Sequence, residues 1–171
     1  PAEQILVGRG SDEGIDLLTR AFCRAGQDSI LVCPPTFGMY AVAARIQGAE
    51  VINLPLRSAN GFSLDIAALA AALTPSVKLV YLCSPNNPTG NRLADDDIDR
   101  VLDLCAGRSL VVLDEAYVEF STGNSRTADL ARHPQLVILR TLSKAHGLAG
   151  ARVGAVLASA AIIGLLRKII P

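Results

Sequence analysis

Neither sign of charge is in excess in this sequence, because sixteen acidic residues balance sixteen basic ones. A surface that binds nucleic acid or another polyanion carries a positive excess, so the composition gives no support to that class of function. Long apolar runs are missing too. The most apolar stretch, 155–166, is bounded by Arg152 and Arg167 and is far shorter than the roughly 20 residues that cross a bilayer. We expect no nucleic acid partner and no membrane span, and we interpret this stretch as core.

The sequence also lacks the spacing of a disulfide framework or a metal site. No two cysteines form a C-x-x-C pair, and no secretory signal opens the chain, so we expect buried, reduced thiols in a cytoplasmic protein. Three consecutive aspartates, 95–97, could suggest a metal, but their place in the first turn of an expected helix is explained more simply by the helix dipole. We therefore expect no metal. The cysteines are Cys23, Cys33, Cys83 and Cys105.

Hydrophobic residues make up half of the chain, and the mean hydropathy is +0.37. A parallel sheet covered by helices explains such a composition, as would a large subunit interface. Short apolar runs alternate with segments of helical periodicity, which predicts an α/β fold with three αβα layers, a mostly parallel sheet and right-handed crossovers. Strands are expected over 4–7, 29–33, 50–54, 77–83, 109–113, 135–139 and 152–158. Helices are expected over 15–25, 36–47 (capped by Thr36), 65–73, 94–106, 127–132 and 159–169.

Polar clusters follow five of the expected strands at the point where each strand ends. In open α/β sheets, ligands bind at the carboxyl ends of the strands, so five such clusters predict a site at one edge of the sheet. They follow Val7, Cys33, Cys83, Leu113 and Leu139.

The segment 140–154 carries the most chemistry. Lys144 comes shortly after a buried strand, where loss of hydration would favour the neutral, nucleophilic amine. Thr141, Ser143 and Arg152 surround it in sequence and suit a phosphate group. An amine nucleophile beside a phosphate site is what pyridoxal 5'-phosphate (PLP) requires, because this cofactor carries an aldehyde and a phosphate. Taken alone, the same residues are also compatible with an ordinary surface loop.

Asp114 follows four apolar strand residues, and a buried carboxylate needs a partner. A protonated pyridine nitrogen would serve, although a structural aspartate that caps the next turn fits equally well. Tyr117 and Asn87 could reach the 3-oxygen of the same ring. For Asn87 the simpler alternative is a plain proline-rich turn.

The segment 8–14, GRGSDEG, invites comparison with a dinucleotide fingerprint. Its third glycine stands at position 14, where that fingerprint requires position 13, which argues against a Rossmann dinucleotide site. Ser11, Asp12 and Glu13 still present free backbone N–H groups at a helix start, which predicts an anion site. Phe37 could stack on a flat ring or belong to the core.

Five motifs in this order resemble the fold-type I, PLP-dependent aminotransferases, and among these most closely the histidinol-phosphate aminotransferases. They are 8–14, 33–40 (CPPTFGMY), 84–90 (SPNNPTG), 114–117 (DEAY) and the segment from 141–144 (TLSK) to Arg152. The resemblance covers the whole chain. It implies Lys144 as the Schiff-base lysine, Asp114 on the pyridinium nitrogen, and Asn87 and Tyr117 on the 3-oxygen. It further implies phosphate contacts from Thr141, Ser143, Arg152, Ser11 and Asp12, with Phe37 stacked on the ring.

Two departures from the family pattern concern the cofactor ring and the domain organisation. Phe37 stands where the family often has tyrosine, which keeps the stacking and loses a hydroxyl. Residues 1–171 resemble only the PLP-binding large domain. The N-terminal arm and the C-terminal small domain, which supplies the arginine for the substrate carboxylate, are not in this sequence, so we expect a piece of a longer protein. The family implies a homodimer with the site near its interface.

The implied reaction is amino transfer from a small-molecule amino donor to a 2-oxo acid. The resemblance of the motifs to the histidinol-phosphate aminotransferases implies L-histidinol phosphate and 2-oxoglutarate as substrates, with imidazole acetol phosphate and L-glutamate as products, in histidine biosynthesis. Alternatives are an aromatic aminotransferase, an amino-acid-phosphate decarboxylase, a PLP-sensing regulatory domain of a transcription factor, and a non-catalytic remnant.

Overall fold

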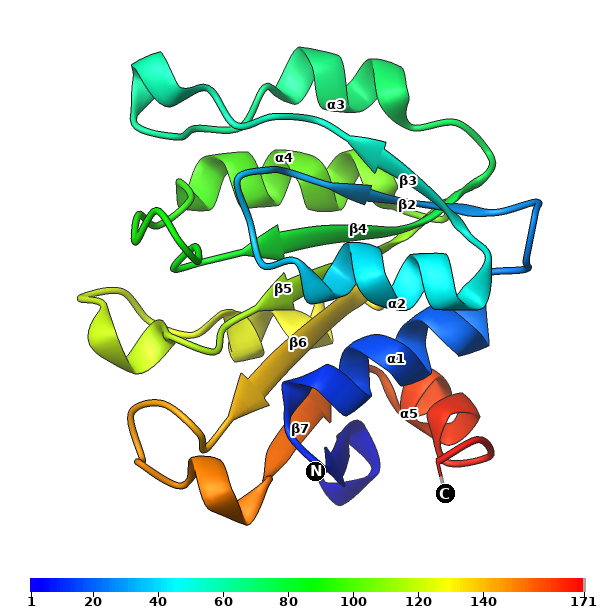
Figure 1. The fold of residues 1–171 in the computed structure, drawn as a ribbon, viewed down its shortest axis with the longest axis vertical. Coiled ribbons are helices and arrows are strands. Elements are labelled where there is room, and N and C mark those ends of the chain that lie inside the picture. Colours follow the sequence, from blue (N-terminus) through cyan, green and yellow to red (C-terminus); the bar gives the residue numbers. More distant parts are fainter. Residues whose placement is uncertain (171) are drawn as a thin grey trace.

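Seven strands form a single sheet in the computed structural model, which describes residues 1–170 (Figure 1). The strand order is β1-β7-β6-β5-β4-β2-β3, and β7 alone runs in the direction opposite to the other six strands. The predicted mostly parallel sheet is therefore confirmed. The strands are β1 (Ile5–Gly8), β2 (Ser29–Val32), β3 (Glu50–Asn53), β4 (Val77–Cys83), β5 (Leu110–Asp114), β6 (Leu136–Thr141) and β7 (Gly154–Leu157).

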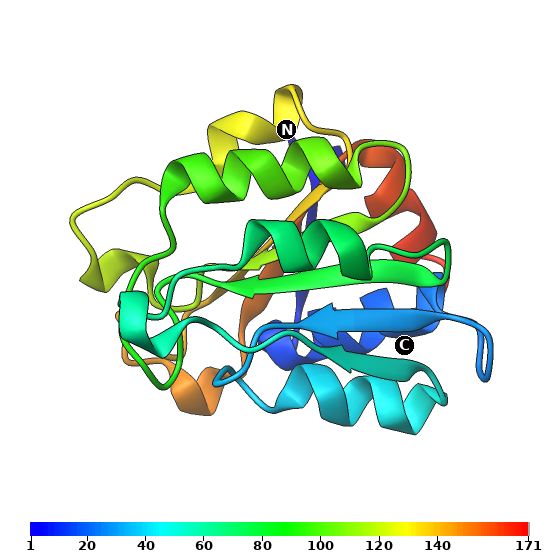
Figure 2. The ribbon, with the colours of Figure 1, turned by 90° about the horizontal axis from the view of Figure 1, so that it is seen from above.

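Helices cover both faces of the sheet and complete the three predicted layers (Figure 2). One core packs α1, α2 and α5 against one face, and a second core packs α3 and α4 against the other. The central strands β4, β5 and β6 are buried on both faces, which explains why they are continuous apolar runs rather than alternating ones. The helices are α1 (Ser11–Phe22), α2 (Met39–Gln47), α3 (Ile66–Ala72), α4 (Asp95–Cys105) and α5 (Ala160–Leu166).

A short 3-10 helix, η1 (Ala2–Gln4), precedes β1, and others lie in connections: η2 (Ser58–Asn60), η3 (Val118–Phe120), η4 (Arg126–Ala131) and η5 (Ala149–Ala151). The element η4 stands where an ordinary helix was predicted over 127–132. The first helix ends at Phe22 rather than at 25, and α5 is shorter than the predicted 159–169.

The predicted start of the second helix at Thr36 is wrong. The helix α2 begins at Met39, and Gly38 is its N-cap residue. The Thr36 hydroxyl instead donates a hydrogen bond to Oδ1 of Asn86, 3.1 Å away, in the turn after β4. Thr36 thus joins two loops at the carboxyl edge of the sheet and caps no helix.

The two cores also contain the residues whose burial the composition predicted. All four cysteines are free and buried, as expected, and burial raises the pKa of the Cys33 thiol to about 12. The apolar stretch 155–166 contributes Val156, Ile163 and Leu166 to the first core. Across residues 1–170, no helix combines the length and the apolar character that a bilayer crossing requires.

Candidate active site

One cavity at the carboxyl edge of the sheet gathers every residue that the sequence predicted for the site. Its wall is built from the ends of β4, β5 and β6, from the start of α1, and from the loops that precede α2 and β7. The parallel direction of β1, β2, β4, β5 and β6 brings their polar ends to this edge, as expected. The predicted residues in its lining are Ser11, Asp12, Phe37, Asn87, Asp114, Tyr117, Thr141, Ser143, Lys144 and Arg152.

The start of α1 forms one end of the cavity. Gly10 precedes the helix with φ +84°, and Ser11 and Asp12 are its first two residues. The turn before it is held by Glu13, whose carboxylate accepts a hydrogen bond from the backbone N–H of Arg9 at 2.7 Å. Because the first N–H groups of a helix have no partner within it, this end of the cavity favours an anion.

Arg152, in the loop before β7, lies at the same end of the cavity as the start of α1. Its backbone adopts φ +50°, a left-handed conformation that is uncommon for a residue other than glycine. Its guanidinium lies 3.7 Å from the Asp12 carboxylate and donates to the carbonyl of Arg9 at 3.4 Å. Left-handed residues of this kind concentrate at ligand sites, and here the conformation places a cation beside the helix start.

Gly154 allows β7 to approach the turn before α1. A Cβ atom at this position would lie 2.4 Å from the carbonyl carbon of Gly10 and 2.6 Å from the backbone N of Ser11. Both distances are shorter than any real contact of a Cβ atom. Only glycine therefore allows the anion end of the cavity to close against β7.

The loop after β6 carries the lysine. Thr141 ends the strand, and its hydroxyl accepts a hydrogen bond from the backbone N–H of Ser143 at 3.2 Å. Nζ of Lys144 lies 5.3 Å from the centre of the Tyr117 ring, within reach of a cation–π contact. The expected desolvation of Lys144 is wrong for this chain, since the side chain is exposed. The strand ends three residues earlier, and the loop that follows runs along the surface.

Asp114 is the buried carboxyl group of the site, with 3% of its surface exposed. Its Oδ1 accepts from the backbone N–H of Ala116 at 3.0 Å, and its Oδ2 accepts from the hydroxyl of Tyr40 at 2.7 Å. Burial raises the pKa of the Asp114 carboxyl, while these two hydrogen bonds act in the opposite direction. A cationic partner in the cavity would favour the ionised form further.

Phe37, Asn87 and Tyr117 contribute apolar and polar groups to the wall of the cavity. Asn87 belongs to a turn that its neighbour Asn86 fixes. The buried amide of Asn86 donates to the carbonyl of Pro35 at 2.8 Å and to the hydroxyl of Thr89 at 2.6 Å. The turn after β4 is thereby joined to the loop that carries Phe37.

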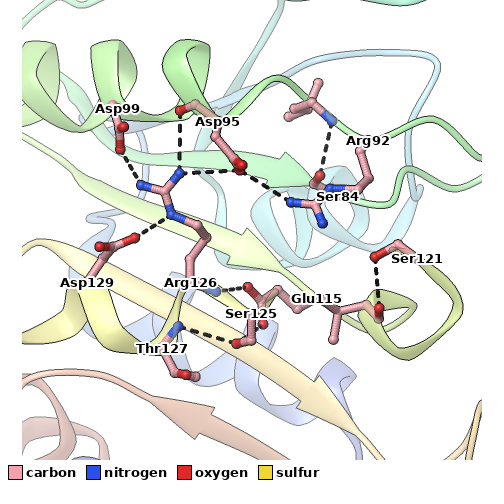
Figure 3. A network of polar contacts seen from close by, with 12 residues as sticks. Ser84, Arg92, Asp95, Asp99, Glu115, Ser121, Ser125, Arg126, Thr127 and Asp129 are labelled. Carbon is pink, nitrogen blue, oxygen red and sulfur yellow. Dashed lines mark hydrogen bonds and ion pairs between the residues drawn. The ribbon is translucent and has the colours of Figure 1, made fainter. Parts of the chain in front are cut away.

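A polar network behind the cavity fixes the segment that follows Tyr117 (Figure 3). The buried carboxylate of Glu115 accepts from the Ser125 hydroxyl at 2.6 Å and from the backbone N–H of Arg126 at 2.7 Å. The Arg126 guanidinium in turn pairs with three aspartates, namely Asp95, Asp99 and Asp129. Asp95, the first of the three consecutive aspartates at the start of α4, thus pairs with Arg126 in addition to its place at the helix dipole.

Sequence reasoning assigned no role to four residues that the structure places at the site. Gly10, Cys83 and Ala116 line the cavity, and Tyr40, which does not line it, donates a hydrogen bond to Asp114. For Tyr40 a signal existed, because a buried phenol and a buried carboxylate each need a partner. The 74 residues between them gave no reason to pair the two.

The whole chain, residues 1–171, matches the family described as aminotransferase class I and II. The chain belongs to this family of aminotransferases. Among curated relatives of this aminotransferase, the histidinol-phosphate aminotransferase of Xylella fastidiosa is 55% identical over 97% of the chain, and that of Pectobacterium atrosepticum is 54% identical over 98%. The chain spans 46% of the length of each of these two relatives.

Solved structures show the same aminotransferase fold. A methionine aminotransferase from Escherichia coli superimposes with a TM-score of 0.89 at 27% identity, covering 98% of this chain and 45% of the other. The histidinol-phosphate aminotransferase from Clostridium acetobutylicum gives a TM-score of 0.88 at 23% identity, over 98% of this chain and 49% of the other. This confirms the fold-type expectation from the sequence.

Proposed function

We propose that the protein is a PLP-dependent aminotransferase that moves the amino group of L-histidinol phosphate to 2-oxoglutarate. The observation that carries this proposal is the single cavity that combines an amine, a buried carboxylate and an anion site at a helix start. Two curated relatives that are 55% and 54% identical to this chain over 168 aligned residues are named histidinol-phosphate aminotransferases, which supports the choice of substrate.

The groups around the cavity fit PLP. The start of α1, with Ser11 and Asp12 as its first residues, would hold the phosphate together with Arg152 and the hydroxyls of Thr141 and Ser143. Asp114 has a buried carboxylate with unused acceptor capacity, which suits the N–H of a pyridinium ring. When bound, PLP supplies an aldehyde that condenses with amines and a ring that accepts electrons.

The predicted site residues would then have definite tasks. Lys144 would hold the cofactor through its Nζ, and its free amine would serve as the base toward the substrate carbon that bears the amino group. Asp114 would keep the pyridine nitrogen protonated. Asn87 and Tyr117 would bind the 3-oxygen of the ring, and Phe37 would pack on its face. Residues 1–171 would form the PLP-binding large domain of a cytoplasmic homodimer.

The assignment of Lys144 is tested by reducing the protein with borohydride in the presence of PLP and mapping the modified peptides by mass spectrometry. The chain has only three lysines, Lys78, Lys144 and Lys168, so the map is simple to interpret. We expect a pyridoxyl adduct at Lys144 alone. An adduct spread evenly over the three lysines, or none at all on a folded protein, would contradict the proposal.

The substrate is tested separately with the full-length protein. We expect transamination with L-histidinol phosphate and 2-oxoglutarate to exceed that with aromatic amino acids at equal concentration. A faster reaction with aromatic amino acids would point to an aromatic aminotransferase, and carbon dioxide release would point to a decarboxylase.

A further inference from the structure

The carboxylate of Asp114 is held by a tyrosine that does not itself line the cavity. Among residues 1–170, its hydrogen bonds come from the Tyr40 hydroxyl at 2.7 Å and from the backbone N–H of Ala116 at 3.0 Å. The two donors bind different oxygens. The tyrosine therefore provides the side-chain contact that fixes the rotation of the carboxylate about its last bond.

Tyr40 is in turn immobilised by its surroundings. It lies in the first turn of α2, is fully buried, and stacks on Tyr81 with ring centres 4.6 Å apart and planes inclined by 13°. Phe37 packs edge-on against its ring, 5.6 Å away. Tyr81 is anchored through its hydroxyl, which lies 3.2 Å from that of Thr19. The Tyr40 hydroxyl consequently has a single fixed direction, toward Asp114.

We propose that Tyr40 is a positioning residue, whose hydroxyl holds the Asp114 carboxylate ionised and oriented for the pyridine nitrogen of PLP. This inference rests on the proposed function. A hydrogen bond to an ionised group is stronger than one between neutral groups, and an unpaired charge at this depth is costly. Removing the hydroxyl leaves Asp114 with one backbone donor, at Oδ1, and no donor among residues 1–170 at Oδ2, so the carboxylate both protonates more readily and is less firmly oriented.

Other charged and titratable groups also face Asp114, and a test must hold them constant. Asp12 from α1 and the adjacent Glu115 oppose its ionisation, and the Cys83 thiol lies beside it on β4. Lys144 and Arg152 line the same cavity and add positive charge. None of these groups changes in a tyrosine-to-phenylalanine substitution, so a difference between two such variants isolates the hydroxyl.

The test compares Tyr40→Phe with Tyr81→Phe in the full-length protein. Both side chains are at most 1% exposed and stack on each other, but of the two only Tyr40 donates to a carboxylate. PLP affinity is measured between pH 4 and 8 by titrating the apoprotein and following the absorbance of bound cofactor. For Tyr40→Phe we expect affinity at neutral pH to fall about tenfold, and the acidic midpoint of the affinity profile to move up by about one pH unit. Tyr81→Phe keeps both the ring that stacks on Tyr40 and the Tyr40 hydroxyl that donates to Asp114, so it should leave the midpoint in place.

The outcomes separate this inference from the proposed function. If the wild-type protein does not bind PLP, the proposed function fails. If it binds PLP and both variants share its acidic midpoint, Tyr40 is merely structural and the inference is overturned. Should Tyr40→Phe fail to fold, the double variant Tyr40→Phe/Asp114→Asn removes the charge along with its donor. Recovery of folding in the double variant supports the inference, and persistent unfolding overturns it.

Discussion

Among the three lysines of the chain, Lys144 differs from the others by its neighbours. Its amine lies near the face of the Tyr117 ring and shares a cavity with the buried Asp114. Nζ of Lys78 instead donates to the carbonyl of Pro75, and the side chain of Lys168 is exposed near the end of the described chain. The chemistry proposed for Lys144 depends on this placement and not on burial.

Replacing Lys144 by alanine should abolish transamination in the full-length protein while leaving its fold intact. The side chain is exposed, so we expect the free energy of unfolding to change by less than about 0.5 kcal/mol. The measurements are the rate with L-histidinol phosphate and a urea unfolding curve. Lys168→Ala is the matched control and should keep full activity. Substantial turnover by Lys144→Ala would refute the role of this lysine.

At the same scale, the sequence predicted the composition of the cavity but not the contacts beneath it. All ten predicted residues line it, because each ends a parallel strand, lies in the loop after one, or begins a helix there. The donor to Asp114 was not predictable, since Tyr40 reaches it only through the packing of α2 on the sheet. The exposure of Lys144 was missed for a similar reason. Proximity to a strand in sequence does not fix the path of a loop.

At the scale of elements, the junction of β7 with the start of α1 is the tightest backbone contact near the site. Gly154→Ala should destabilise the protein by about 2 kcal/mol or more, because the new methyl group would overlap the backbone of Gly10 and Ser11. It should also weaken PLP binding by displacing the helix start. Thermal unfolding and PLP titration measure the two effects.

The control for this substitution is Gly164→Ala within α5, where a Cβ atom meets no neighbouring atom. Alanine is favoured over glycine in a helix interior, so we expect a small gain of about 0.5–1 kcal/mol and no change in PLP affinity. Equal effects of the two substitutions on stability and PLP affinity would contradict the steric overlap expected between a side chain at position 154 and the backbone of Gly10.

The network behind β5 predicts a dependence of stability on pH. Burial raises the pKa of the Glu115 carboxyl above its ordinary value, so this group favours folding most at low pH. The stabilisation that Glu115 contributes is lost as the pH rises from the ordinary pKa of a glutamate through the raised pKa of this carboxyl. The free energy of unfolding of Glu115→Gln, taken relative to wild type, should therefore increase with pH across this window and remain constant at higher pH. Urea unfolding from pH 4 to 8 measures the slope, with the exposed Glu3→Gln as a control.

A constant offset between wild type and Glu115→Gln is also expected, because the amide replaces an acceptor of the Ser125 and Arg126 hydrogen bonds. The offset does not alter the sign of the slope. A stability difference that is the same at every pH would contradict a raised pKa for this carboxyl.

At the scale of the whole molecule, the alternation of apolar runs and helical segments was sufficient to predict seven strands and their layers. The buried strands β4, β5 and β6 were predictable because both of their faces are apolar. The boundaries of the elements near the carboxyl edge of the sheet were harder to predict. The loop before α2 and the element η4 are shaped by side-chain contacts such as those of Thr36 and Arg126, which local propensity does not contain.

Cofactor binding should stabilise the whole protein by mass action. With PLP at a hundred times its dissociation constant, we expect the free energy of unfolding to increase by about 2.7 kcal/mol. Pyridoxal at the same concentration lacks the phosphate for the helix start and should give a much smaller increase. Differential scanning calorimetry of the full-length protein measures both, and equal effects of the two compounds would contradict a phosphate site at α1.

The sheet order has a consequence for synthesis on the ribosome. Within the described residues, the only neighbour of β1 is β7, which the ribosome adds about 150 residues later. The other five strands can assemble as they emerge, since each pairs with strands close in sequence. The first strand must therefore wait while the rest of the sheet forms, and the anion site beside it is completed last. A nascent chain stalled before Gly154 would hold a folded centre and an unpaired N-terminal segment that proteases can reach.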